Sequence, residues 1–258
     1  NKFIINEVHD IDGDGEFNLK DIAKQLKTNK HNEWTPLEKD GDFRSPECVK
    51  LLEQSDIVVT NPPFSLFRPY VKQLFDYNKK FVIIGNMNAV TYKEIFPLIR
   101  DNKMWLGNGF HSGNAYFSTP FAKEYGEGVY MPETGLVKFR NCCWLTNLDH
   151  GRRHQPLPLM TMEENLKYSK HKEIKGKKMY EKYDNYDAIP RDYTGAMGVP
   201  LGFLDKYSLE QFEIIGGTAN GQVPNEFKIG NFKVYNNPIA NGRKIYQRVL
   251  IRHKKKII

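Results

Sequence analysis

The sequence contains few cysteines and no long hydrophobic run. Only 3 of its 258 residues are cysteines, and two of them, Cys142 and Cys143, are adjacent. This spacing fits neither a disulfide framework nor a zinc site, so we expect core residues in a reducing, cytoplasmic compartment. The longest uninterrupted apolar runs have four or five residues, as at 81–84, whereas a membrane-spanning helix needs about 20. We therefore expect no membrane association.

Acidic residues are scarce in the last two fifths of the chain. Residues 1–150 carry 18 basic and 20 acidic side chains, a net charge of −2, whereas residues 151–258 carry 20 and 11, a net charge of +9. A basic module beside a near-neutral one is typical of proteins that grip a phosphate backbone, although lysine-rich surfaces also serve solubility alone. Aromatic and basic residues interleave at 167–172, 177–183 and 246–252. We expect a catalytic domain in the first part and a target-recognition domain in the second.

Short apolar runs alternate with helix-like stretches in the first part. The strand-like runs are residues 3–8, 57–60 and 81–84. The helix-like stretches are residues 19–26, 47–54, 66–77 and 91–102. This alternation predicts an α/β fold with a parallel sheet covered by helices on both faces. Two later segments, 104–106 and 141–148, are expected to close the sheet as antiparallel strands.

The four residues Asn61, Pro62, Pro63 and Phe64 directly follow the second apolar run. The exocyclic amine of adenine is a weak nucleophile because its lone pair is delocalised into the ring. The Asn61 side-chain oxygen and the Pro62 carbonyl can each accept one N–H of such an amine, while Pro63 restricts the backbone. Phe64 can stack on a base swung out of the duplex. The string is typical of an enzyme that methylates amino nitrogens, although it also suits an ordinary turn.

Several longer blocks carry a family resemblance. They are residues 40–47, 55–67, 79–94, 103–107, 143–148, 182–189, 195–200 and 248–252. In these blocks and in their order, the chain resembles the EcoRI-type adenine-specific DNA methyltransferases. The resemblance implies a Rossmann-like fold that uses S-adenosylmethionine to methylate N6 of a flipped adenine in double-stranded DNA. It also implies a bacterial or phage restriction-modification enzyme with a cognate restriction endonuclease, or an orphan relative.

The resemblance also bears on cofactor binding. By analogy with the family's third motif, Asp42 would accept a hydrogen bond from the amino group of the cofactor's adenine, and Phe43 would lie against the ring. The same stretch also reads as a helix-capping turn, with Ser45 as N-cap and Pro46 at the first helical position. The family's N-terminal portion, which grips the methionine end of the cofactor, is expected to be missing. We therefore expect an incomplete cofactor pocket in these residues alone.

A second pattern, at residues 10–21, has the spacing of an EF-hand calcium loop. Its acidic residues are Asp10, Asp12, Asp14, Glu16 and Asp21. They stand at loop positions 1, 3, 5, 7 and 12, with glycine at position 6, as wrapping around a hard cation requires. Position 12 departs from the usual glutamate, and a strand precedes the loop. We predict a structural calcium ion, with an acidic turn closed by Asx hydrogen bonds as the alternative.

Two other kinds of function remain open. RNA adenine and protein glutamine methyltransferases present a planar amine or amide to the same Asn-Pro-Pro-aromatic arrangement, although the basic second part disfavours a protein substrate. A non-catalytic DNA-binding relic is the other alternative, because the first cofactor motif is expected to be absent.

Overall fold

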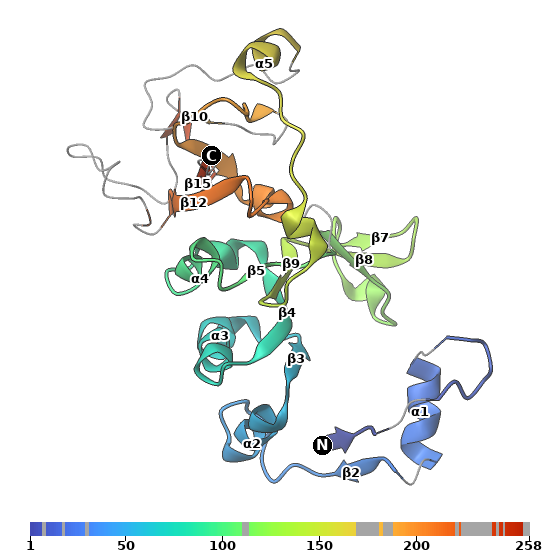
Figure 1. Cartoon of the computed structure of the whole chain (residues 1–258). Coiled ribbons are helices and arrows are strands. Elements are labelled where there is room, and N and C mark those ends of the chain that lie inside the picture. The colour runs from blue at the N-terminus through green and yellow to red at the C-terminus, as the bar shows by residue number, and fades with distance from the viewer. Residues whose placement is uncertain are drawn as a thin grey trace. The chain divides into compact units, whose positions relative to one another are not determined.

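The computed structural model describes a mixed α/β protein with several small sheets (Figure 1). The described residues are 1–6, 9–16, 19–28, 31–109, 114–168, 181–182, 188–219, 222, 239–240, 243–244 and 246–254. The chain folds as two compact units, Asn1–Asp56 and Ile57–Ile258. The predicted boundary between residues 150 and 151 falls inside the second unit and stays a prediction. Within the described residues, no helix is long and apolar enough to span a membrane.

The N-terminal unit contains two short strands and two helices. Its elements are β1 (Lys2–Ile4), α1 (Leu19–Thr28), β2 (Glu33–Thr35) and α2 (Pro46–Gln54). Both helices were predicted. Helix α2 starts as expected, with Ser45 as N-cap accepting a hydrogen bond from the Cys48 N–H at 3.2 Å and with Pro46 in the first turn.

The prediction placed the first strand in the wrong sheet. Strand β1 pairs antiparallel with β2, so that Phe3 lies opposite Trp34, and it does not join the parallel sheet. Phe3 is 49% exposed, unlike a residue of a central parallel strand. A short apolar run cannot distinguish a buried parallel strand from half of a small antiparallel ribbon, because both lack a long periodic signal.

The sheet that carries the predicted reactive loop has the order β3-β4-β9-β5. Its strands are β3 (Ile57–Thr60), β4 (Lys80–Asn86), β9 (Cys142–Thr146) and β5 (Trp105–Leu106). Strands β3 and β4 are parallel, and β9 runs antiparallel to both β4 and β5. The prediction for 141–148 is therefore confirmed. The prediction for 104–106 needs correction, since β5 opposes β9 and so runs in the direction of β3 and β4.

Burial within this sheet follows the strand order. Strand β4 buries one face, with Phe81 and Ile83 fully buried, whereas β9 has buried side chains on both faces, among them Cys142, Cys143 and Leu145. Strand β3 is an edge strand among those described, and its Ile57 and Val59 are exposed. The expectation that every strand is covered on both faces is therefore wrong for β3.

Helix α3 (Phe67–Asp76) connects β3 to β4 and was predicted with nearly these bounds. Phe67, Val71 and Leu74 form its buried face. The helix expected at 91–102 is shorter: a 3₁₀ turn, η2 (Met87–Thr91), precedes α4 (Phe96–Arg100). Pro97 stands in the first turn of α4, where its missing N–H costs no intrahelical bond, and it cannot continue a helix from upstream.

The remaining elements form a small three-stranded sheet and a C-terminal sheet. The first has the order β6-β8-β7, the second β10-β11-β15-β12, and a further pair is β13-β14. The elements are η1 (Phe64–Leu66), β6 (Asn114–Phe117), η4 (Ala122–Glu124), β7 (Tyr130–Met131), β8 (Leu136–Arg140), η5 (Gly151–His154), α5 (Met162–Tyr168), β10 (Glu181–Lys182), β11 (Met197–Pro200), η7 (Leu201–Lys206), β12 (Phe212–Gly217), β13 (Ile239–Ala240), β14 (Arg243–Lys244) and β15 (Arg248–His253). Of the segments in which aromatic and basic residues interleave, residues 169–172, 177–180 and 183 lie outside the described residues.

Candidate active site

The predicted reactive loop directly follows β3. Thr60, the last residue of β3, pairs with Ile83 of the parallel strand β4, and the chain then leaves the sheet at its carboxyl edge. Reactive loops of open α/β sheets lie beyond this edge. Pro62 is buried, whereas Asn61 is exposed and Phe64 is 51% exposed. The loop therefore presents an amide and an aromatic ring around a buried proline.

Packing fixes the loop on its C-terminal side. The Pro63 carbonyl accepts a hydrogen bond from the Leu66 N–H at 2.9 Å, which forms the 3₁₀ turn η1. Phe67 then begins α3 and is 3% exposed. Its ring lies over Gly85 of β4, where a side chain would collide with it: an added Cβ would be 3.0 Å from Phe67 Cε2. The reactive loop is thus held between a paired strand and a buried aromatic anchor.

The end of β4 and the start of β9 lie at the same edge of the sheet as the reactive loop. Asn86, at the end of β4, accepts a hydrogen bond through its side chain from the Asn88 N–H at 2.8 Å. The Met87 N–H donates to the Asn141 carbonyl at 2.6 Å, and Asn86 is opposite Cys142 at the start of β9. Sequence reasoning missed Asn86, although a polar residue at the end of a buried strand-like run was a usable signal.

Asp42 and Phe43 belong to the N-terminal unit. The Asp42 carboxylate accepts two hydrogen bonds from the Arg44 guanidinium, at 2.8 and 2.5 Å, and one from the Arg44 backbone N–H at 2.8 Å. The side-chain bond from Arg44 is the main reason that the pKa of Asp42 falls to about 2. Arg44 also lies 5.3 Å from the centroid of the Phe43 ring. Asp42 is therefore an ionised acceptor, as recognition of an adenine amino group requires, and a carboxylate has about four acceptor sites.

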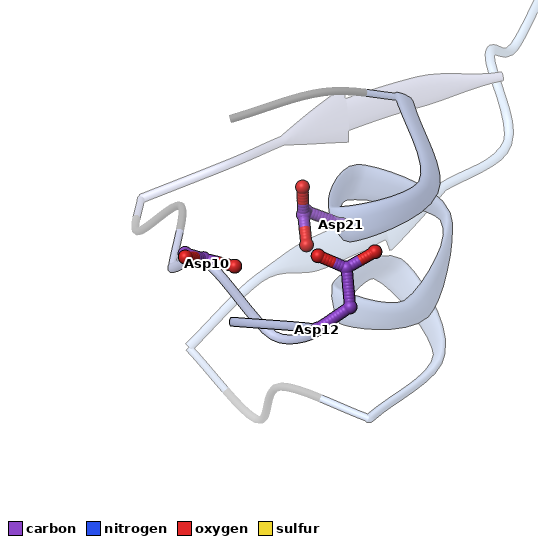
Figure 2. Close-up of side chains that lie close together, drawn as sticks. All are labelled: Asp10, Asp12 and Asp21. Carbon is purple, nitrogen blue, oxygen red and sulfur yellow. The ribbon is translucent and has the colours of Figure 1, made fainter. Parts of the chain in front are cut away.

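Three of the five predicted cation ligands come together. Carboxylate oxygens of Asp10, Asp12 and Asp21 lie within 4.8 Å of one another (Figure 2). In the part of the chain that the structure describes, this group does not include Asp14 or Glu16. Asp14 instead accepts a local hydrogen bond from the Glu16 N–H at 2.8 Å.

Hydrogen bonds within the loop also match the alternative of an acidic turn. Asp10 accepts from the N–H groups of Gly13 and Gly15 at 2.6 and 2.8 Å. Gly15, at the predicted sharp turn, has a φ of 81°, which glycine adopts without strain. Asp21 is fully buried and accepts from the Ile11 N–H at 3.0 Å. Because the same contacts suit an Asx-closed turn, the calcium ion stays a prediction.

A charged cluster joins the segment after β9 to the C-terminal sheet. His154 contacts Glu210 at 2.5 Å and Asp149 at 2.8 Å, and Arg153 pairs with Asp149 at 2.8 Å. Hydrogen bonds with Glu210 and Asp149 raise the pKa of His154, and the bond with His154 is the main reason that the pKa of Asp149 falls to about 2. Arg153 also stacks on Trp105 of β5, 3.5 Å from its ring centroid. Sequence reasoning missed this cluster, because its members lie up to 61 positions apart and form no local pattern.

Comparison with known proteins identifies the family. The model of the family described as adenine-specific methyltransferase EcoRI matches residues 1–254. The chain belongs to the EcoRI adenine-specific methyltransferase family. This membership implies a Rossmann-like methyltransferase fold and S-adenosylmethionine as cofactor, and it gives no support to calcium.

Three bacterial relatives are similar to the chain over most of its length. The chain is 45% identical over 227 residues to "Type II methyltransferase M.EcoRI" of Escherichia coli, covering 84% of this chain and 63% of the relative. It is 36% identical to M.MgeORF184P of Mycoplasma genitalium and 34% identical to M.MpnI of Mycoplasma pneumoniae, both also type II methyltransferases. These matches cover 84% and 86% of this chain and 71% and 72% of the relatives. The chain thus spans less than two thirds of the length of the E. coli relative. No solved structure matches.

Proposed function

We propose that the protein transfers a methyl group from S-adenosylmethionine to N6 of an adenine flipped out of double-stranded DNA. The observation that carries this proposal is the string Asn61-Pro62-Pro63-Phe64 directly after β3, with its amide and ring exposed and Pro62 buried. The E. coli relative's name, a type II methyltransferase, supports the reaction class and a role in restriction-modification. Such an enzyme acts on DNA in the bacterial cytoplasm and works with a cognate restriction endonuclease.

The chain's own residues perform the orientation that this chemistry needs. The Asn61 side-chain oxygen and the Pro62 carbonyl accept the two N–H bonds of the adenine amine, which concentrates its lone pair on nitrogen. Pro63 restricts the conformation of the residue before it and so limits the directions in which the Pro62 carbonyl can point. Phe64 stacks on the flipped base and replaces the stacking that the base loses on leaving the duplex. Positioning and electrostatics supply most of the acceleration, so no covalent enzyme intermediate is needed.

The cofactor would be recognised in part by Asp42 and Phe43. When bound, S-adenosylmethionine supplies an electrophilic methyl group on a sulfonium sulfur. Asp42 would accept from the adenine amino group through an acceptor site that Arg44 leaves open, and Phe43 would contact the adenine ring. Asp42 is ionised across the whole physiological pH range, and Arg44 lowers its pKa further, to about 2.

Residues 151–258 would provide the target-recognition domain. Their net charge of +9 supports contact with the phosphate backbone. In the N-terminal unit, the loop formed by Asp10, Asp12 and Asp21 would hold a structural calcium ion. A catalytic role for that ion is not proposed, since methyl transfer from a sulfonium needs no Lewis acid.

The deciding experiment uses the complete protein as the cell makes it. Wild type and Asn61→Ala are incubated with unmethylated genomic DNA and labelled S-adenosylmethionine, and N6-methyladenine is mapped by sequencing. Wild type should methylate one short sequence, and Asn61→Ala should lose at least about 100-fold in rate, as expected for removal of an orienting hydrogen bond. The control variant is Gln54→Ala, which removes an exposed amide of α2 and should keep wild-type activity.

Other outcomes identify the alternatives. Cofactor binding by wild type without incorporation into DNA would favour RNA, which the same assay tests with RNA as the methyl acceptor. A wild-type protein that binds DNA but no cofactor would be a DNA-binding relic. If Asn61→Ala retained full activity, the proposed role of the reactive loop would be refuted even if DNA is the substrate.

A further inference from the structure

The sheet formed by β6, β8 and β7 extends from the same edge as the reactive loop. Strand β8 ends at Arg140, and Asn141 alone separates it from β9. Asn141 adopts a φ of 60° and accepts the Met87 N–H at 2.6 Å, which ties this junction to the end of β4. Since β4 lies between β3 and β9, the start of β9 is two strand spacings, or roughly 10 Å, from the strand that carries Asn61, and Arg140 stands two residues before β9.

One face of this sheet is apolar and partly buried, with Phe117, Phe139 and Tyr125 between 37% and 40% exposed. Ala115 and Val137 are buried. On the same face, the rings of Phe117 and Phe139 meet edge to face at 5.7 Å, and Tyr125 meets Phe139 in the same way. Because side chains alternate between the faces of a strand, the neighbours of these residues must project from the opposite face.

The opposite face is polar, basic and aromatic along β6 and the end of β8, whereas Leu136 and Met131 make its other end apolar. Asn114 is directly opposite Arg140, and Tyr116 is directly opposite Lys138. The Lys138 ammonium lies 5.6 Å from the centroid of the Tyr116 ring, which is 50% exposed, and Arg140 is exposed. Strands β6 and β8 contain no acidic residue, and the acidic residue of the β7–β8 turn, Glu133, is at the other end of β8 from Arg140.

We propose that this face, defined by Asn114, Tyr116, Lys138 and Arg140, contacts duplex DNA beside the target adenine. The inference rests on the proposed function and adds a contact surface within residues 1–150, outside the basic part of the chain. Lys138 and Arg140 bind backbone phosphates, and Tyr116 packs its ring against sugar or base. Phosphates of one strand recur about every 3.4 Å along the duplex axis, so cations on a sheet that begins beside the loop's edge reach phosphates that flank a flipped nucleotide.

Variants that remove a positive charge test the phosphate contacts, and a variant that removes only the ring tests the contact with sugar or base. Removing one phosphate contact reduces the slope of log K against log salt by about 0.9 in B-DNA. Lys138→Gln combined with Arg140→Gln should therefore weaken binding and lower the slope by about 2. Tyr116→Ala should weaken binding without changing the slope, because it removes no charge. The control Lys24→Gln with Lys50→Gln removes two exposed lysines of α1 and α2 and should change neither quantity.

The measurement is the affinity of the complete protein for a fluorescent duplex of random sequence, taken at several salt concentrations. Random sequence suffices because phosphate contacts do not depend on base identity. Circular dichroism and urea midpoints check that the variants are folded, and glutamine keeps the first two methylene groups of each side chain. Methylation by wild type is measured separately.

The two proposals fail in different ways. Failure of wild type to bind or methylate any duplex would refute the proposed function. A wild type that binds and methylates DNA, with a double glutamine variant of unchanged affinity and slope, would overturn this surface alone. A fall in slope equal to that of the lysine control would do the same, because it would show a general charge effect.

Discussion

Substitution of Gly85 by alanine should destabilise the second unit and disturb the reactive loop together. Gly85 is buried in β4, between Phe67 at the start of α3 and Leu145 of β9. A Cβ at this position would lie 2.9 Å from Leu145 Cδ1 and 3.0 and 3.1 Å from two atoms of the Phe67 ring. Contacts this short are rarely or never made by real Cβ atoms, so one of the two side chains has to move.

The change in the free energy of unfolding is the difference between a packing cost in the folded state and an entropy gain from the unfolded state. Inserting a methyl group into a well-packed core typically costs about 1–3 kcal/mol. Replacing glycine lowers the entropy of the unfolded chain, which returns about 0.4–1 kcal/mol. The expected net decrease in the free energy of unfolding is about 1–2 kcal/mol. With a urea m-value of about 2–3 kcal/mol/M for a chain of this size, the midpoint falls by roughly 0.5 M.

Urea unfolding followed by the fluorescence of Trp105 and Trp144, in protein whose Trp34 is replaced by phenylalanine, measures this decrease. Methyl transfer measures the effect on the loop. If the Phe67 side chain is displaced by the new methyl group, the reactive loop moves with it. Methyl transfer then falls at urea concentrations where the protein is still folded. Gly126→Ala is the matched control, since no heavy atom lies within 4 Å of its added Cβ. The double variant Gly85→Ala with Phe67→Leu should lose less stability than the sum of the single variants. Equal midpoints for Gly85→Ala and Gly126→Ala would refute the packing argument.

Two further results are expected. Because Glu210 and Asp149 raise the pKa of His154 above 6.5, protonated His154 stabilises the fold fully below about pH 6.5, and this contribution disappears as pH rises through the folded pKa. The urea midpoint of wild type should exceed that of His154→Asn by more at about pH 6 than at about pH 9; equal differences would contradict this role. In the N-terminal unit, calcium added to chelator-treated protein should raise the melting temperature of wild type but not of Asp21→Asn. An unchanged wild-type melting temperature would identify the loop as an acidic turn.

Local patterns in the sequence determined the helices α1, α2 and α3 and the place of the reactive loop. Ser45 and Pro46 mark the start of α2 because capping depends on residues a few positions apart. The apolar spacing of α3 and the strand-like run before Asn61 are equally local. A strand followed by a sharp turn at the carboxyl edge of a sheet needs no distant contact to be recognised. The family, too, followed from the sequence, since its model matches residues 1–254.

Only the tertiary structure decided which strands pair and which loops meet. The sequence indicated a strand at 3–8 but not its antiparallel partner β2, and it did not place β9 between β4 and β5. Pairing depends on side chains that arrive from distant positions to cover each face, and short apolar runs do not encode that choice. For the same reason, the sequence did not show where the basic face at Lys138 and Arg140 lies. The hydrogen bond from Met87 to Asn141 places it beside the end of β4. The contact that joins the 149–154 segment to Glu210 is likewise set by how the sheets pack, a property of the whole fold.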